Sequence, residues 1–347
     1  MNKYLFIIAI GFIIVLNSCS DNLIYENSNL FSRNDFENIF ELKGKVLFSD
    51  SVVYKPQTLQ VYDSLLIVKE NGNKHFVIYN LNTMKKVGER ISVGQGPKEL
   101  IYPLMVKNYD KSIFIHDLQK MTLIDYSKKD FLEQANPIPL STIKLEKRAL
   151  SLVALLDEGF IGYSYDPHHP LFKFDQQGKY ISNIMEYPIC RKKDYTDTER
   201  MDAFQFFYTT NLSDKVFVCY GWTDLIELLD SEGNVLKRLH GPDKFYPHFK
   251  EVRESKIITT VMEKNVNRNA YFCPTKVNDC FWALYSGKLE NQNDLLCNEI
   301  FVFDKNGNPK TIYKLDHGIF TFAIDEIHRK IYGISNQPEY YILEYRF

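Results

Sequence analysis

Three segments of the chain repeat one pattern: a strand-like apolar run, the turn Asp-x-x-Gly, and a second strand-like run. These segments are residues 171–181, 225–236 and 300–310. The aspartate side chain starts a type I turn, and the glycine takes the left-handed conformation of the bulge that closes the hairpin. Similar runs without the glycine occupy residues 76–80 and 122–126. The sequence therefore predicts an all-β fold.

The spacing of these repeats indicates a β-propeller. The residues that mark successive copies are Asn80, Asp125, Asp175, Asp230, Asp304 and Glu344. They are 45, 50, 55, 74 and 40 residues apart, and a four-stranded blade needs roughly 40–50 residues. The longest spacing leaves room for a seventh blade, but residues 243–269 are rich in charge and contain a helix-favouring run at 250–256, which indicates an insertion. We predict a six-bladed β-propeller of four-stranded antiparallel blades.

The two ends of the chain are expected to close the ring together. The chain ends on a strand-like run at residues 341–347, so the last blade lacks an outer strand. The run near residues 46–54 is predicted to supply it, because this pairing hides both free strand edges. The predicted propeller domain spans residues 41–347.

The N-terminal residues predict a lipoprotein. A positive start precedes an apolar run of 13 residues, 4–16. At about 1.5 Å per residue this run is too short to cross a ~30 Å hydrocarbon core, and it fits a signal peptide. The following Leu-Asn-Ser-Cys resembles the bacterial lipobox, whose cysteine, here Cys19, takes a diacylglycerol on its thiol. We predict a signal peptide at 1–18 and a lipid on Cys19, with a plain secretory signal or an uncleaved anchor as alternatives.

The residues after Cys19 predict how the protein is held. Ser20 occupies the position where an aspartate would retain some bacterial lipoproteins in the inner membrane, so an outer-membrane lipoprotein is expected. Its periplasmic or outward orientation stays open. Residues 19–40 are predicted to comprise the lipidated cysteine and a flexible tether, because the segment is polar and rich in asparagine.

Charge and cysteine content narrow the possible partners. The chain has 42 Lys and Arg against 44 Asp and Glu, whereas nucleic-acid binding needs a basic face, so no nucleic-acid partner is predicted. Five cysteines beyond Cys19 cannot all pair with one another, and none forms a Cys-x-x-Cys motif. They are Cys190, Cys219, Cys273, Cys280 and Cys297. Cys273 and Cys280 either face each other across a hairpin or are buried thiols, so the disulfide state stays open.

One short segment carries a family resemblance. Residues 94–100 read Gly-Gln-Gly-Pro-Lys-Glu-Leu after a strand-like run. This is similar to the Gly-x-Gly-Pro-Gly-Glu-Phe segment of TolB-like six-bladed propeller lipoproteins, with Lys98 in place of a glycine and Leu100 in place of an aromatic residue. The resemblance implies a six-bladed fold in the cell envelope. It makes Gly94, Gly96, Pro97 and Glu99 candidate binding residues, and the alternative is that the glycines only shape a connection between blades.

Two further groups are candidates for ligand contact. His168 and His169 form a polar cluster between prolines, but adjacent side chains of an extended segment point to opposite sides, so an exposed loop is expected rather than a metal site. An aromatic run could stack on sugar rings, or it could fill the core of a strand. It comprises Phe204, Phe206, Phe207 and Tyr208.

No catalytic, nucleotide-binding or metal-binding motif is found in the sequence, and no cofactor is predicted. We expect a membrane-anchored binding or scaffold domain for a protein, peptide or glycan. The alternative is an envelope hydrolase or lyase with its site at the central channel of the propeller, where residues from several blades would meet. Convergent carboxylates or histidines with perturbed pKa values at the channel mouth would favour an enzyme, and an apolar or mixed rim would favour a partner site.

Overall fold

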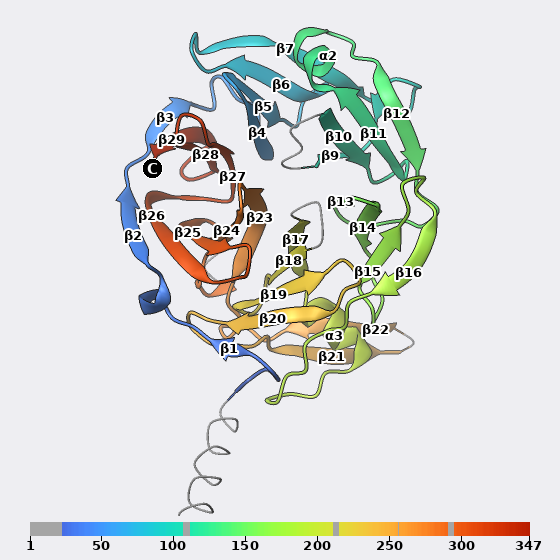
Figure 1. Ribbon diagram of the computed structural model, residues 1–347, viewed down its shortest axis with the longest axis vertical. Coiled ribbons are helices and arrows are strands. Elements are labelled where there is room, and N and C mark those ends of the chain that lie inside the picture. Colours follow the sequence, from blue (N-terminus) through green and yellow to red (C-terminus); the bar gives the residue numbers. More distant parts are fainter. Residues whose placement is uncertain (1–22, 107–111, 211–214, 256, 291–294) are drawn as a thin grey trace, which may run out of the picture.

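The computed structural model describes residues 23–106, 112–210, 215–255, 257–290 and 295–347. They form seven β-sheets, six of which are arranged as blades around a central axis (Figure 1). The prediction of an all-β, six-bladed propeller is confirmed. Cys19 and the predicted signal peptide lie outside the described residues.

Blades 1 to 3 follow one another along the chain, each with four antiparallel strands from the centre outward. Blade 1 consists of β4 (Thr58–Tyr62), β5 (Leu65–Lys69), β6 (Lys74–Asn80) and β7 (Lys85–Val93), with the short β8 (Glu99–Leu100) parallel to β7. Blade 2 consists of β9 (Pro103–Met105), β10 (Ser112–Asp117), β11 (Thr122–Ser127) and β12 (Pro139–Lys144), with α2 (Lys128–Glu133) before β12. Blade 3 consists of β13 (Ala154–Leu156), β14 (Gly159–Tyr163), β15 (Leu171–Phe174) and β16 (Tyr180–Ile184).

Blades 4 to 6 repeat this order, and each takes an outer strand from the start of the chain. Blade 4 consists of β17 (Phe206–Thr210), β18 (Lys215–Tyr220), β19 (Leu225–Asp230) and β20 (Val235–His240). Blade 5 consists of β23 (Tyr271–Val277), β24 (Cys280–Tyr285), β25 (Cys297–Asp304) and β26 (Pro309–Ile319). Blade 6 has β27 (Thr321–Asp325), β28 (Lys330–Ser335) and β29 (Tyr341–Arg346).

Residues 23–48, which we call the strap, run around the outside of these last three blades (Figure 1). The strap comprises β1 (Asn29–Leu30), the short 3-10 helix η1 (Arg33–Asp35), β2 (Asn38–Leu42) and β3 (Lys45–Phe48). β1 pairs with β20 and β2 pairs with β26, both in parallel. β3 pairs antiparallel with β29 and completes blade 6. The predicted closure of the ring by the two ends of the chain is therefore confirmed.

The described part of the predicted tether, residues 23–40, differs from the prediction because it is bound to the propeller. Tyr25, Phe31 and Phe36 are buried, and they lie among the polar residues that suggested a flexible segment. Their burial removes large apolar surface from water, at roughly 25 cal/mol per Å². The backbone between them pairs with the otherwise free edges of blades 4 and 5. The folded unit therefore starts well before residue 41.

The long spacing between the fourth and fifth markers contains an insertion, as predicted, and its described residues form no seventh blade. Its secondary structure differs from the prediction, because the described residues of the helix-favouring run, 250–255, are not helical. β21 (Phe249–Glu254) and β22 (Ile257–Met262) form an antiparallel hairpin that packs on α3 (Asp197–Ala203). The β-branched run in β22, Ile-Ile-Thr-Thr-Val, favours a strand and overrides the helix preference of the charged residues.

The Asp-x-x-Gly turns have the predicted geometry. Gly178, Gly233 and Gly307 have φ values of 80°, 86° and 71°, in the left-handed region. In the first turn, the Asp175 carboxylate accepts hydrogen bonds from the backbone N–H groups of residues 177 and 179, both at 2.9 Å. The strand pairings of all three hairpins shift at this point, which is the predicted bulge.

The hydrophobic core lies between neighbouring blades. Phe217 of blade 4 and Phe281 of blade 5 stack with ring centroids 4.7 Å apart. Phe76 of blade 1 meets Phe131 of α2 at 5.8 Å. Because the aromatic residues fill the gaps between blades, they hold the blades in a ring.

Candidate functional site

The antiparallel order of the strands gives the propeller two distinct faces. The turn between the first and second strand of each blade lies on one face, which we call the mouth face. The connections between successive blades, such as residues 94–102 and 185–205, lie on the opposite face, which we call the connection face. A site on one face is therefore separated from a site on the other by the length of the inner strands.

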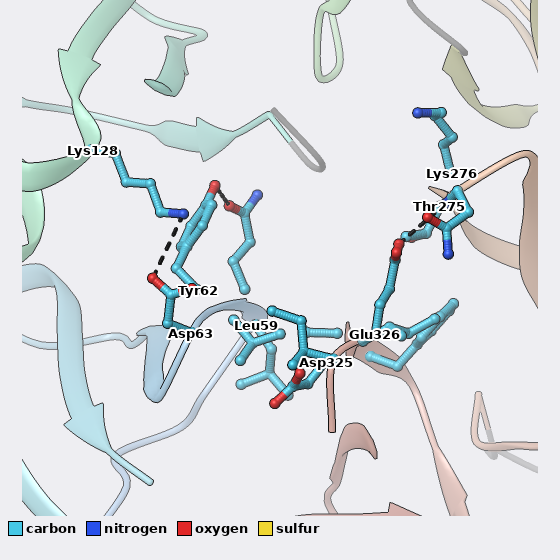
Figure 2. A pocket seen from close by; sticks show the side chains of 15 residues that line it. Leu59, Tyr62, Asp63, Lys128, Thr275, Lys276, Asp325 and Glu326 are labelled. Atoms are coloured by element: carbon cyan, nitrogen blue, oxygen red, sulfur yellow. Dashed lines mark hydrogen bonds and ion pairs between the residues drawn. The ribbon is translucent and has the colours of Figure 1, made fainter. Parts of the chain in front are cut away.

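A cavity of about 310 Å³ opens at the central channel on the mouth face, and we call it the channel mouth. Its walls come from the innermost strands β4, β23 and β27 of blades 1, 5 and 6, and from Lys128 at the start of α2. Figure 2 shows Asp63 and Lys128 on one wall and Lys276 and Glu326 on the other. Elements that are far apart in the sequence thus meet at one opening.

The carboxylates of the channel mouth already have partners. The Lys128 ammonium lies 3.9 Å from the Asp63 carboxylate. The backbone N–H of Asn278 donates to Glu326 at 3.1 Å. The Asp325 carboxylate lies 2.7 Å from the His328 ring nitrogen. These carboxylates are held in separate pairs rather than as one convergent cluster.

Apolar side chains complete the rim of the channel mouth. Leu59 and Phe322 are buried in its wall, whereas Ile327 is 78% exposed. An exposed isoleucine beside paired charges gives the mixed rim that favours a partner site. The sequence analysis expected the channel mouth to distinguish an enzyme from a binding protein, but it identified none of the residues that line it. These residues lie in or beside the turn that follows an innermost strand, and this position in the repeat is the signal that would have identified them.

The loop that carries the family resemblance, residues 94–100, is held by hydrogen bonds within the loop and from Lys120. The N–H of Gly96 donates to the Glu99 carboxylate at 3.0 Å, and the Lys120 ammonium donates to the carbonyl oxygens of Gly96 and Glu99 at 3.0 and 2.7 Å. A Cβ on Gly94 would collide with the same carboxylate, so a glycine there leaves Glu99 room for its bond. Pro97 is exposed. These contacts match the alternative in which the loop shapes the connection between blades 1 and 2, and a binding role for these residues stays a prediction.

His168 and His169 lie in an exposed loop between β14 and β15, as expected. The Asp166 carboxylate accepts hydrogen bonds from both of their backbone N–H groups, at 2.9 and 2.8 Å. The two histidines line a cavity of about 400 Å³ on the connection face together with Cys190 and Tyr195. The structure therefore keeps them apart from the 94–99 loop, which belongs to another pair of blades.

The chemistry of this second cavity gives no sign of an activated nucleophile. Burial raises the pKa of the Cys190 thiol, so the thiol stays protonated at neutral pH. Its cations are paired, with Lys193 lying 3.1 Å from Glu199 and Arg200 lying 3.0 Å from Asp197. Among the residues that the structure describes, no three His, Cys, Asp or Glu side chains gather as metal ligands.

The aromatic run follows the core alternative. Phe204 and Phe206 are buried in the cluster between blades 3 and 4. The Tyr208 hydroxyl donates to the carbonyl oxygen of Leu152 at 2.6 Å. Phe207 is half-exposed and its ring lies 5.4 Å from that of Phe272 on the next innermost strand. Three of the four side chains thus pack in the core or bond to the backbone of a neighbouring blade.

The structure forms no disulfide among the five cysteines that it describes after Cys19. Cys219 and Cys297 are buried in strands, and Cys190, Cys273 and Cys280 are half-buried. Cys273 and Cys280 share the β23–β24 hairpin without a bond between them, and the Cys273 thiol instead lies 3.5 Å from the carbonyl oxygen of Phe320. The pairing across the hairpin is therefore not formed, and of the five cysteines only Cys219 and Cys297 match the buried-thiol alternative.

The fold and the channel mouth define a six-bladed propeller with an open, mixed-character mouth. The model of the TolB-like 6-blade propeller-like family matches residues 35–327. The chain belongs to this family, in agreement with the resemblance at residues 94–100. None of the curated proteins compared with the chain matches it.

Two solved structures share this fold. A member of the DUF4221 family from Bacteroides vulgatus is similar with a TM-score of 0.55 and 11% identity, over 88% of this chain and 98% of that one. A protein from Bacteroides fragilis, provisionally described as exported, is similar with a TM-score of 0.50 and 14% identity, over 89% of this chain and 99% of that one. At such low identity these similarities concern the fold alone.

Within the described ranges, no helix has the length and apolar character needed to span a bilayer.

Proposed function

We propose that this protein is a lipoprotein of the bacterial cell envelope, anchored by a lipid on Cys19, whose propeller binds a protein, peptide or glycan at the channel mouth. The propeller fold supports a binding or scaffold domain in general. The observation that carries the proposed site is the mixed rim, where exposed Ile327 stands beside carboxylates that already have partners. Such a surface offers apolar area and orienting charges to a partner.

The envelope assignment is supported by three observations. The lipobox-like sequence ends at Cys19 after a short apolar run. The chain belongs to the TolB-like propeller family. A structure of the same fold is provisionally described as an exported protein. With Ser20 after the cysteine, we infer the outer membrane as the destination.

We expect the substitution Cys19→Ala to release the protein from membranes. Two or three acyl chains anchor a protein firmly, whereas a protein without them has only its surface for contact. In a fractionated cell, the membrane share should fall from nearly all of the protein to below about a tenth. Ser20→Ala is the matched control and should stay in the membrane. If the Cys19→Ala protein has lost its signal segment and still stays entirely in the membrane fraction, the lipid anchor is refuted.

We expect the substitution Ile327→Glu to reduce recovery of the partner at least about tenfold, since a charge would replace apolar area in the contact. Tagged full-length protein is extracted in mild detergent, and the molecules that co-purify are identified by mass spectrometry. Ile138→Glu is the matched control, because Ile138 is 65% exposed but lies beside the outer strand β12. Equal recovery with both variants would remove the channel mouth from the interaction. A clean monomer would refute a stable protein partner and favour a small ligand, including a substrate of the alternative hydrolase or lyase.

A further inference from the structure

The strap joins the propeller at the rim between blades 3 and 4. The backbone N–H of Arg191 donates to the carbonyl oxygen of Ile24 at 2.8 Å, and the N–H of Glu26 donates to that of Ile189 at 3.1 Å. Between these bonds, the Tyr25 side chain is completely buried. The start of the strap is thus fixed on the connection-face side of the rim.

This attachment lies close to the proposed lipid. Ile24 is five positions after Cys19 in the chain, and five fully extended steps span at most about 18 Å. A lipid on Cys19 therefore keeps this part of the rim within about 18 Å of the membrane surface, whatever path the intervening residues follow. This step rests on the lipid anchor of the proposed function.

The rim at this place has exposed aliphatic side chains around a shallow cavity of about 380 Å³. Ile189, Val235 and Leu236 are 61%, 41% and 54% exposed, and they line the cavity together with Glu26 and residues of the strap. Val235 and Leu236 belong to β20, ahead of the part of that strand that β1 covers. We call these three residues and Glu26 the anchor-side edge.

The charges of the anchor-side edge are neutralised locally. The Arg191 guanidinium lies 3.7 Å from the Glu26 carboxylate. Arg238, behind Leu236, is paired with buried Glu227 at 2.6 Å. Glu186 and Lys237, which also line the cavity, add one charge of each sign. The surface therefore combines exposed aliphatic groups with balanced charge, and neither an excess of acid nor an excess of base opposes its approach to lipid headgroups.

We propose that the anchor-side edge rests on the lipid surface, with Ile189, Val235 and Leu236 at the boundary between headgroups and acyl chains. Apolar side chains of interfacial segments reach about 5–10 Å into this boundary. The short distance to Cys19 selects lipid as the occupant, because it holds this edge beside the bilayer. The anchor-side edge lies on the outer strand of blade 4, whereas the channel mouth is lined by innermost strands of blades 1, 5 and 6, so docking through this edge leaves the mouth open to a partner.

The experiment places a fluorescent reporter on the edge of the full-length lipidated protein. The purified Leu236→Trp protein is reconstituted into vesicles of phosphatidylethanolamine and phosphatidylglycerol, with and without brominated acyl chains, which quench tryptophan at short range. We expect the added tryptophan to lose at least about half of its emission and to shift to shorter wavelength, since it would leave water. Val87→Trp is the matched control, because Val87 is 50% exposed on the outer strand β7 of blade 1, across the ring from blade 4. Its added emission should be unaffected.

The possible outcomes distinguish failure of the proposed docking from failure of the proposed lipid anchor. The mass of the N-terminal peptide reports directly whether Cys19 carries acyl chains. If the acylated Leu236→Trp protein is quenched no more than the Val87→Trp control, the docking is overturned and the lipoprotein proposal stays intact. If both reporters are quenched strongly and equally, the propeller has no defined orientation on the membrane and the proposed docking is overturned. An unacylated Cys19 overturns the anchor and, with it, the docking.

Discussion

Replacing Arg238 by alanine should lower the free energy of unfolding by about 3–5 kcal/mol, because the change leaves a buried carboxylate without its charge partner. The Glu227 side chain is completely buried in blade 4. The Arg238 guanidinium donates to one of its oxygens at 2.6 Å, and the Tyr220 hydroxyl donates to the other at 2.8 Å. Arg238 also donates to the carbonyl oxygen of Glu26 at 2.6 Å, so its loss removes a contact that holds the strap as well.

Urea unfolding of the purified protein, followed by circular dichroism, measures this loss. The matched control is Lys86→Ala, which breaks an ion pair with Glu89 of the same 2.6 Å length but with both side chains about half exposed. Exposed pairs contribute about 0–1 kcal/mol, so the control should change stability little. Removing both members together, in Arg238→Met with Glu227→Leu, should recover much of the loss, because no unpaired charge remains. A loss for Arg238→Ala no larger than that for Lys86→Ala would show that the pair is not buried in solution.

The propeller itself could be predicted because its signals are local. Each Asp-x-x-Gly turn contains, within four residues, both the side chain that starts the hairpin and the glycine that the bulge requires. Gly178 and Gly233 adopt the expected left-handed conformation. The closing strand followed from a second local fact, that the chain ends on a strand without a partner. Both inferences needed only the regular geometry of hairpins and the cost of free strand edges.

The strap and the hairpin insertion could not be predicted from such local signals. The aromatic residues of the strap are sparse in the sequence, and they stabilise the fold only because Phe31 and Phe36 pack into one apolar cluster with side chains of blades 4 and 5. In the insertion, the charged run 250–256 favours a helix locally, yet pairing of Val252 with Thr259 and packing on α3 select a hairpin. In both places the tertiary partner, which is distant in the sequence, decides the structure.

The residues of the channel mouth could not be predicted either, because they too come together only in the tertiary structure. Asp63, Asn278 and Glu326 stand in turns after three different innermost strands, and only the closed ring brings these turns together. Conversely, the segment that stood out most in the sequence, residues 94–99, uses its polar groups to bond to itself and to Lys120. A conspicuous motif in a repeat protein therefore indicates how blades are joined at least as readily as where a ligand binds.

The strap is expected to contribute to stability as part of the folded domain, and its two phenylalanines near blade 5 provide the test. Phe36 is buried, with its ring centroid 4.9 Å from that of Phe301 and 5.6 Å from that of Phe303. Phe40 lies four residues further along the same segment, is 49% exposed and stacks on Tyr313 at 5.9 Å. The two residues have the same chemistry and the same neighbouring blade, and they differ in burial.

We expect Phe36→Ala to lower the free energy of unfolding by about 3–5 kcal/mol, the range for deleting a buried phenylalanine ring. Phe40→Ala should cost less than about 1 kcal/mol, since about half of its surface is already exposed to water. Urea unfolding measures both losses, and hydrogen exchange at the backbone of β2 reports whether the strap detaches before the blades unfold. If residues 23–40 were a flexible tether in solution, the two substitutions would have the same small effect. A large loss for Phe36→Ala alone, with exchange in β2 faster than in β25, would mean that the strap is a folded part of blade 5 whose release precedes the opening of the ring.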